Sequence, residues 1–231
     1  MSQYKHIFFD LDRTLWDFEQ NMRITLTEIY KNHNLNKTIP SPEVFIDAYI
    51  VNNDRLWASY QRGEMKKEVL RYKRFELTLR DFGIKDKVLA SVIGHEYLSE
   101  SPKKTVLLPN TLPVLNWLYT RYKLHIITNG FNEVQFTKLK MCGIEKYFDK
   151  VLTSEMSGYH KPRAEAFGYS LSSANAKKAE SIMIGDDLET DIIGAKNFGI
   201  DQVYFNPSKQ PQPKVEVTHE ISNLIELKDI L

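Results

Sequence analysis

Short apolar runs alternate with longer amphipathic stretches along much of the chain. Four runs have the length and composition of buried β-strands, and they occupy residues 7–9, 124–127, 181–184 and 202–205. Segments of helical length lie between or after them, at residues 111–121, 132–142, 164–175 and 188–198. Gly143 and Gly199 follow two of these segments, as glycine often does at helix ends. Strands alternating with helices predict an α/β fold with a parallel sheet.

The alternation breaks between residues 16 and 105, which show consecutive helical patterns and no convincing strand. One helical stripe comprises Phe18, Met22, Leu26, Ile29 and Tyr30, and another comprises Met65, Val69, Tyr72, Leu79 and Phe82. This spacing is typical of helix–helix packing. Ser41 followed by Pro42 predicts a helix start between the two stripes. We therefore predict an α/β core of residues 1–15 and 106–231, with a helical domain of residues 16–105 inserted after the first strand.

Composition narrows the possible partners. The 31 Lys and Arg residues against 30 Asp and Glu leave a formal net charge of +1, which argues against binding a nucleic-acid polymer. No apolar run approaches the ~20 residues of a membrane span. The first six residues show no leader pattern, and the single cysteine, Cys142, suits a reducing compartment. We expect a cytoplasmic protein with no membrane contact, with a surface loop at residues 206–213; the sequence indicates no oligomeric state.

Polar side chains follow three of the predicted strands. They are Asp10, Asp12 and Thr14 after the first, Thr128 and Asn129 at the end of the second, and Asp186, Asp187 and Asp191 after the third. The carboxyl ends of parallel strands border the ligand crevice of open α/β sheets. By itself, Asp10-Leu11-Asp12 fits turn chemistry as well as a nucleophile beside an acid/base. Lys161 adds a cation. Pro162 keeps this residue out of the helix that follows.

These segments, in this order, resemble the motifs of the haloacid dehalogenase superfamily of hydrolases. The resemblance spans the predicted core and implies a Rossmann-like parallel sheet. The helical insert is similar to the all-helical cap domains of that family. The resemblance further implies that Asp10 is the nucleophile and Asp12 the general acid/base. It assigns phosphoryl binding to Thr128 and charge neutralisation to Lys161.

Magnesium is the cofactor that the resemblance implies, with Asp186 as a ligand. Asp10 and the backbone carbonyl of Asp12 would supply two further oxygens, the ligand type that Mg²⁺ prefers. By the same resemblance, Asp191 supports the metal water or Lys161. Asp187 and Asp191 also suit a helix N-terminus. Supporting roles in the phosphate-binding loops are expected for Thr14 and Asn129.

Elementary chemistry agrees with these roles. A phosphate dianion repels an attacking carboxylate, and a divalent cation together with Lys161 offsets that repulsion. Asp10 would attack phosphorus to give an aspartyl phosphate. Asp12 would protonate the departing alkoxide and later deprotonate the hydrolytic water.

Asp12 also favours phosphoryl transfer over dehalogenation, because the resembling 2-haloacid dehalogenases lack a second Asp here. The segment from Asp10 to Phe18, the helical cap and the Thr128-Asn129-Gly130 segment look like the branch that includes pyrimidine 5′-nucleotidases. We expect a magnesium-dependent phosphomonoesterase acting on nucleoside 5′-monophosphates or similar small phosphometabolites. The alternatives are a sugar-phosphate or phosphoglycolate phosphatase, a phosphomutase and, less favoured, a 2-haloacid dehalogenase or a non-catalytic binding protein.

Three residues beside the first motif stay open in role. Trp16 and Phe18 lie where the chain leaves the core, and they suit either stacking on a base or hinge packing. Arg13 occupies a position where Gly, Asn, Asp or His is commoner in the resembling family, and it suits either solvent or a contact with the leaving group.

Overall fold

The computed structural model describes residues 3–209 and 215–231 of the chain. Two compact units make up the protein: one consists of Met1–Phe18 and Thr105–Leu231, the other of Glu19–Lys104. The sequence placed these two boundaries after residues 15 and 105. Residues 210–213 of the expected surface loop lie outside the described residues.

The sheet of the first unit is parallel throughout. Its strands among the described residues are β1 (His6–Phe9), β2 (Lys123–Thr128), β3 (Phe148–Thr153), β4 (Ser181–Gly185), β5 (Asp201–Phe205) and β6 (His219–Ile221). They are ordered β3-β2-β1-β4-β5-β6, and every neighbouring pair is parallel. The predicted α/β, Rossmann-like core is thereby confirmed. The strand order reverses direction between β1 and β4, and ligands of open α/β sheets bind at such a switch point.

Two edge strands, β3 and β6, are absent from the prediction. Asp149 and Lys150 of β3 are exposed, so that strand lacks a continuous apolar run. β6 has only three residues, and two of them are His219 and Glu220. An edge strand buries less of its surface than a central one, so its sequence carries a weaker apolar signal.

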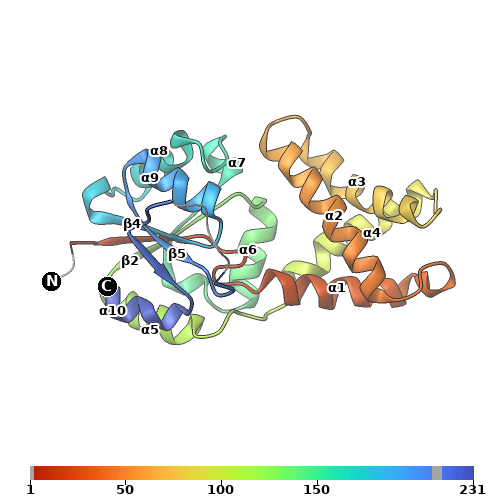
Figure 1. The fold of residues 1–231 in the computed structure, drawn as a ribbon, viewed down its shortest axis with the longest axis horizontal. Coiled ribbons are helices and arrows are strands. Elements are labelled where there is room, and N and C mark those ends of the chain that lie inside the picture. The colour runs from red at the N-terminus through yellow and green to blue at the C-terminus, as the bar shows by residue number, and fades with distance from the viewer. Residues whose placement is uncertain (1–2, 210–214) are drawn as a thin grey trace. The chain divides into compact units, whose positions relative to one another are not determined.

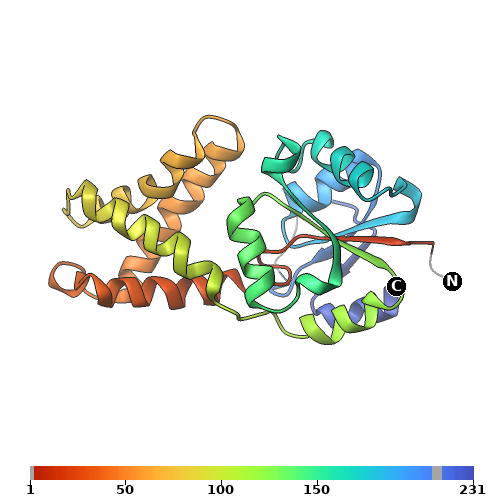
Figure 2. The same ribbon diagram turned by 180° about the vertical axis from the view of Figure 1, so that it is seen from behind.

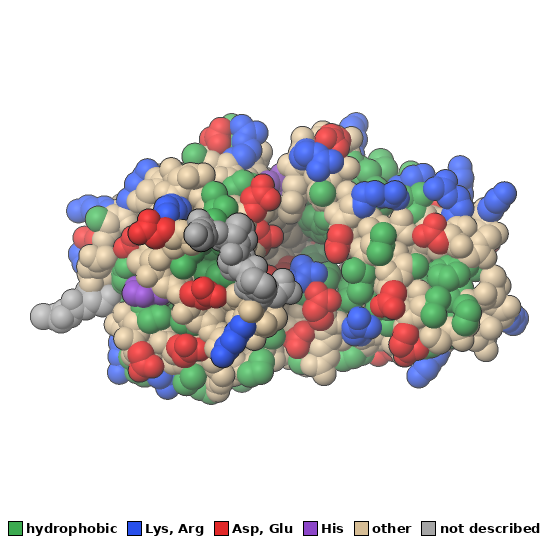
Figure 3. All heavy atoms as spheres, viewed as in Figure 1, with side chains coloured by type: hydrophobic (Ala, Val, Ile, Leu, Met, Phe, Trp, Pro, Cys, Tyr) green, Lys and Arg blue, Asp and Glu red, His purple; other side chains and the backbone are tan. Residues whose placement is uncertain are grey.

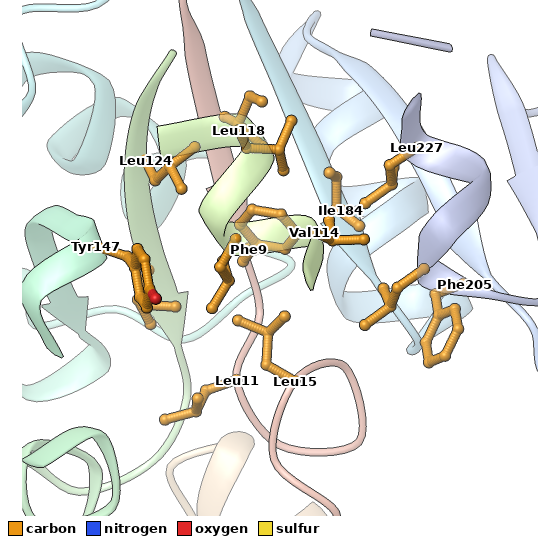
Figure 4. Close-up of a cluster of buried hydrophobic side chains, with 14 of the residues drawn as sticks. Phe9, Leu11, Leu15, Val114, Leu118, Leu124, Tyr147, Ile184, Phe205 and Leu227 are labelled. Carbon is orange, nitrogen blue, oxygen red and sulfur yellow. The ribbon is translucent and has the colours of Figure 1, made fainter. Parts of the chain in front are cut away.

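Helices cover both faces of the sheet (Figures 1 and 2). One face packs against α5 (Thr111–Tyr119), α6 (Asn132–Met141) and α10 (Leu227–Ile230); the other packs against α8 (Ala164–Ser173) and α9 (Gly194–Phe198). Because alternate side chains of a strand point to opposite faces, Ile7 and Phe9 of β1 enter the first layer and Phe8 enters the second. In Figure 4, Phe9, Val114, Leu118 and Ile184 converge between β1, β4 and α5.

Shorter elements connect these layers. They are η3 (Glu145–Tyr147), α7 (Ser154–Ser157), η4 (Lys178–Glu180), η5 (Leu188–Ile193) and η6 (Leu224–Glu226). The predicted helix at residues 188–198 is therefore two elements, the π-helical η5 followed by α9. Gly143 and Gly199, at φ 67° and 90°, follow α6 and α9 as predicted.

The second unit is helical, with α1 (Phe18–Asn32), η1 (Leu35–Lys37), α2 (Pro42–Gln61), α3 (Lys67–Asp81), α4 (Lys87–Glu100) and η2 (Ser101–Lys103). Ser41 caps α2 with Pro42 at its first position, as predicted. The α1 stripe is buried from Met22 to Tyr30. The second stripe is partly wrong, because Tyr72 is 39% exposed and α3 buries Leu70 and Phe75 instead.

The chain leaves and re-enters the first unit through two paired segments. Asp17 donates its backbone N–H to the carbonyl of Val106 at 3.1 Å, and Leu108 donates to the carbonyl of Leu15 at 2.9 Å. Trp16 bridges antiparallel to Leu107 between them. The two ends of the inserted segment are thus held side by side by backbone hydrogen bonds.

The surface of the α/β unit shows mixed charge. On the face seen in Figure 3, acidic and basic side chains are interspersed, as the nearly equal numbers of the two lead one to expect. Among the described residues, no helix combines the length and apolarity that crossing a membrane requires.

Candidate active site

A tight turn follows β1 and separates the two aspartates of the first motif. The backbone N–H of Asp10 still bonds to the Ile184 carbonyl of β4, at 2.9 Å. Beyond it, Leu15 and Trp16 both donate to the Leu11 carbonyl, and Arg13 takes the left-handed φ of 63° that closes the turn. Asp10 therefore sits at the end of the strand, while Asp12 lies in the turn that follows.

Lys161 joins the ends of two strands to η5. Its side chain is 2% exposed, and Nζ lies 2.6 Å from a carboxylate oxygen of Asp10 and 2.6 Å from one of Asp191. A third bond runs from Nζ to the Ile127 carbonyl of β2 at 2.8 Å. The ammonium group thus has all three of its donors satisfied by acceptors at the switch point.

Asn129 holds the backbone of Lys161 in place. Its Oδ1 accepts from the Lys161 N–H at 2.8 Å, and its Nδ2 donates to the Lys161 carbonyl at 3.0 Å. One side-chain amide therefore satisfies both backbone groups of Lys161. These two hydrogen bonds connect the end of β2 to the loop that carries Lys161.

Asp186, after β4, completes a group of three carboxylates. Oxygens of Asp10, Asp186 and Asp191 lie within 4.8 Å of one another. Thr14 donates its hydroxyl to Asp186 Oδ1 at 3.2 Å. The sequence predicts the side chains of Asp10 and Asp186 and the backbone carbonyl of Asp12 as metal ligands, with Asp191 in support, and the structure brings the side chains of Asp10, Asp186 and Asp191 together.

Burial is the largest single influence on the pKa values of Asp10, Asp186 and Lys161. Burial raises the pKa of Asp10 well above its usual range, opposed by Lys161 and reinforced by Asp191. Burial and then Asp191 raise the pKa of Asp186 to about 7. For Lys161, burial lowers the pKa, but Asp10 and Asp191 outweigh this effect and raise it. Lys161 therefore stays charged, while the carboxylates gain from a further cation. An all-oxygen donor set of this kind fits Mg²⁺.

Thr128 ends β2 with its hydroxyl facing two donors. Oγ1 accepts from the backbone N–H of Gly130 at 3.1 Å and from Gln135 Nε2 at 2.6 Å. Both lone pairs of the oxygen are thus used, and the hydroxyl proton remains to be donated elsewhere. A Cβ at Gly130 would lie 2.5 Å from the Gln135 side chain, so this contact requires glycine.

Asp12 turns toward α6. Its Oδ1 lies 2.5 Å from Lys138 Nζ, and its Oδ2 accepts from Gln135 Nε2 at 2.9 Å. The sequence reasoning missed both α6 residues. The available signal was a lysine on the buried face of a helix that begins just after the Thr128-Asn129-Gly130 segment.

The remaining expected residues have mostly structural contacts. Asp187 caps η5, accepting from the backbone N–H groups of Glu189 and Thr190. Trp16 is fully buried in the core, so the structure places it in a packing position and not as an open surface for a base. Phe18 is partly buried, with the guanidinium carbon of the exposed Arg13 4.2 Å from its ring centroid.

Curated proteins of known description match almost the whole chain. It is 31% identical to the pyrimidine 5′-nucleotidase YjjG of Escherichia coli, over 97% of this chain and 96% of that protein. It is 30% identical to the pyrimidine 5′-nucleotidase PynA of Streptococcus pneumoniae, over 99% and 95%. It is 29% identical to the putative HAD-hydrolase YfnB of Bacillus subtilis, over 100% and 97%.

The crystal structure of YfnB bound to magnesium also matches in fold. Its TM-score is 0.89, with 26% identity over 99% of both chains. The sequence profile of the family described as haloacid dehalogenase-like hydrolase matches residues 7–205, which include β1 except for its first residue, the strands β2 to β5 and all of the site residues above. The chain is therefore an enzyme of the haloacid dehalogenase-like hydrolase family.

Proposed function

We propose that this hydrolase is a magnesium-dependent phosphomonoesterase that works through an aspartyl phosphate. The observation that carries the proposal is the placement of Asp10 at the switch point, where Lys161 Nζ joins it to Asp191. Asp186 lies beside Asp10 and Asp191, and Asp12 stands two residues after Asp10 along the chain. A nucleophile, a fixed cation, a cation-binding group and an acid/base are the parts that phosphate ester hydrolysis requires.

In the first half-reaction, a carboxylate oxygen of Asp10 attacks phosphorus while the ester oxygen leaves with a proton from Asp12. Lys161 offsets the repulsion between the carboxylate and the phosphoryl oxygens, and the Thr128 hydroxyl donates its free proton to one of those oxygens. In the second half-reaction, water attacks phosphorus, Asp12 takes its proton, and the bond between Asp10 and phosphorus breaks. The net reaction converts a phosphate monoester and water into an alcohol and phosphate.

Asp10, Asp186 and the backbone carbonyl of Asp12 would hold Mg²⁺, with Asp191 next to them. Bound there, the ion supplies positive charge that neutralises the phosphoryl oxygens. Burial, reinforced by neighbouring carboxylates, raises the pKa of Asp10 and of Asp186, and a cation bound between them would favour their ionised forms.

Nucleoside 5′-monophosphates are the proposed substrates. Two relatives at 30% and 31% identity, matched over nearly their whole lengths, are named pyrimidine 5′-nucleotidases. Related small phosphometabolites share the same phosphoryl chemistry. We place the reaction in the cytoplasm, because a chain whose one cysteine is Cys142 suits a reducing compartment.

Phosphate release from a substrate panel tests the proposal. The panel contains purine and pyrimidine 5′-monophosphates, sugar phosphates including glyceraldehyde 3-phosphate, and phosphoglycolate, each with magnesium or with a chelator. We expect release that requires magnesium and is greatest with pyrimidine nucleotides. Asp10→Asn should lower kcat/KM by about 10³-fold or more. Asp229→Asn, at an exposed position of α10, is the matched control and should keep full activity.

Each outcome decides a separate part of the proposal. Higher activity on sugar phosphates would retain the mechanism and exclude nucleotides as the preferred substrates. Release that persists undiminished in Asp10→Asn would exclude Asp10 as the nucleophile. Release unaffected by the chelator would exclude the role of magnesium.

A further inference from the structure

Helix α6 occupies both carboxylate oxygens of Asp12. Lys138 Nζ lies 2.5 Å from Oδ1, and Gln135 Nε2 lies 2.9 Å from Oδ2. The two donors are three residues apart and so share one face of the helix. Each carboxylate oxygen keeps a second lone pair that can carry or accept a proton. The side chain is thus held at two points without losing its capacity for proton transfer.

Lys138 is an unusual residue for its position. Its side chain is 5% exposed, and Nζ lies 4.2 Å from the ring centroid of the buried Trp16. Lysine is almost never fully buried unless paired, and a buried ion pair adds little stability compared with apolar residues of the same volume. Stability alone therefore does not account for a lysine here.

Gln135 connects Asp12 to the phosphoryl-binding side of the site. A carboxylate only accepts hydrogen bonds, so the Nε2 end of the amide must face Asp12. The other Nε2 hydrogen goes to Thr128 Oγ1 at 2.6 Å. The side chain is fully buried, so it is shielded from water that would compete for these two hydrogen bonds. One buried amide group thus bridges Asp12 and Thr128.

We infer that Lys138 and Gln135 are positioning residues that hold the Asp12 carboxyl where it transfers a proton to the leaving group. This inference rests on the proposed phosphomonoesterase function. In the step concerned, the bond from phosphorus to the ester oxygen breaks, and the proton of Asp12 moves to that oxygen. An acid free to rotate would spend less time in line with the ester oxygen, and proton transfer in the transition state would be slower.

Leaving-group dependence separates this role from a structural one. An alkoxide needs a proton in order to leave, whereas p-nitrophenolate leaves without one. We therefore compare kcat/KM for UMP and for p-nitrophenyl phosphate in wild type and in Lys138→Met. The variant should lose about 10- to 100-fold on UMP, since general acid catalysis supplies at least that much, and change little on p-nitrophenyl phosphate. The ratio of the two values is independent of the fraction of folded enzyme.

A second variant and a control support the measurement. Gln135→Met removes the other tether and should shift the same ratio in the same direction. Lys140→Met changes an exposed lysine on the same helix and should leave the ratio at its wild-type value. Lys138→Met leaves the Asp12 carboxylate without its cation, and because that side chain is 25% exposed, thermal unfolding should show a smaller loss of stability than loss of a cation from a fully buried group would cause.

The outcomes keep the two proposals apart. Equal losses on both substrates in both variants would overturn the positioning role, and so would an unchanged ratio. A wild type that releases phosphate from neither substrate, or a release that Asp10→Asn leaves undiminished, would overturn the phosphomonoesterase function itself. A ratio shifted in both variants, with Lys140→Met unchanged, is the result expected.

Discussion

Two buried polar clusters lie at opposite ends of β1 and β2. The cluster at the carboxyl ends keeps a charged lysine, whereas the cluster toward the amino ends favours neutral histidines. At the carboxyl ends, Lys161 is buried with Asp10 and Asp191 within 2.6 Å. Toward the amino ends, His6 Nδ1 and His125 Nε2 lie 3.0 Å apart, with their rings stacked. Both clusters are shielded from solvent, so burial alone does not explain the contrast.

The contrast follows from the number of charged partners. Burial, and then the neighbouring His6, lower the pKa of His125 to about 4, and the carboxylate of Asp149, 3.9 Å away and half exposed, offsets only part of this shift. For Lys161, Asp10 and Asp191 overcome the same burial effect and raise the pKa. Charge survives burial in this sheet where several opposite charges converge, and among the described residues they converge at the carboxyl ends of β1 and β4.

Replacing Lys161 should have the largest effect on the contrast between the two clusters. Lys161→Met leaves two buried carboxylates without their cation, so we expect the free energy of unfolding to fall by about 3 to 5 kcal/mol. Loss of a group that offsets phosphoryl charge should also lower kcat/KM by about 10²-fold or more. Urea denaturation and phosphate release measure the two effects. Lys140→Met, on the exposed side of α6, is the control, and a Lys161→Met protein as stable as wild type would contradict the argument.

The histidine pair gives the second effect, with a defined sign. His125 has a lower pKa in the folded than in the unfolded chain, so its contribution to stability is present above pH 6.5 and is lost as the pH falls toward 4. By pH 5 the loss amounts to roughly 2 kcal/mol. Urea unfolding at pH 7 and pH 5 isolates this loss as the difference between wild type and His125→Phe, because the other titrating groups, Asp186 among them, are common to both proteins. The same pH dependence in both proteins would show that His125 is not its source.

The smallest effect concerns magnesium and the carboxylates. Asp186 has its pKa raised to about 7, so its contribution to stability is present in acid and is lost as the pH rises through about 7. Metal binding requires the ionised form, and affinity should rise about tenfold from pH 6 to pH 8. That change is worth about 1.4 kcal/mol of added stabilisation. Thermal unfolding with and without magnesium measures it; a stabilisation independent of pH, or one kept in Asp186→Asn, would contradict it.

Much of the fold could be predicted because its central strands are buried on both faces. Residues 7–9 and 181–184 read as continuous apolar runs for that reason, and β1 and β4 match them closely. The edge strand β3 was not predicted, because the exposed Asp149 and Lys150 interrupt its apolar pattern. On α3, sequence spacing favoured Tyr72, whereas the structure buries Arg74 among the rings of Tyr49, Phe75 and Tyr97. A buried arginine contradicts the apolar pattern on which such predictions rest.

In the candidate site, too, some residues could be predicted from the sequence and others could not. Asp10, Asp186 and Lys161 were found from the sequence because each follows a strand or precedes a helix in a recognisable segment. Lys138 and Gln135 were missed because their importance lies in a contact with Asp12, more than 120 residues away. Position in a motif is visible in sequence, whereas the partner of a helical lysine depends on how α6 packs.

The paired segments at Trp16 and Leu107 close the α/β unit where the helical unit is inserted. Backbone bonds between Asp17 and Val106 and between Leu15 and Leu108 join the two ends of the insert from within the α/β unit. Insertions are tolerated where the chain ends are adjacent, because the host fold closes without them. An insert joined in this way can be exchanged between genes while the strand ends that carry the candidate catalytic residues remain intact.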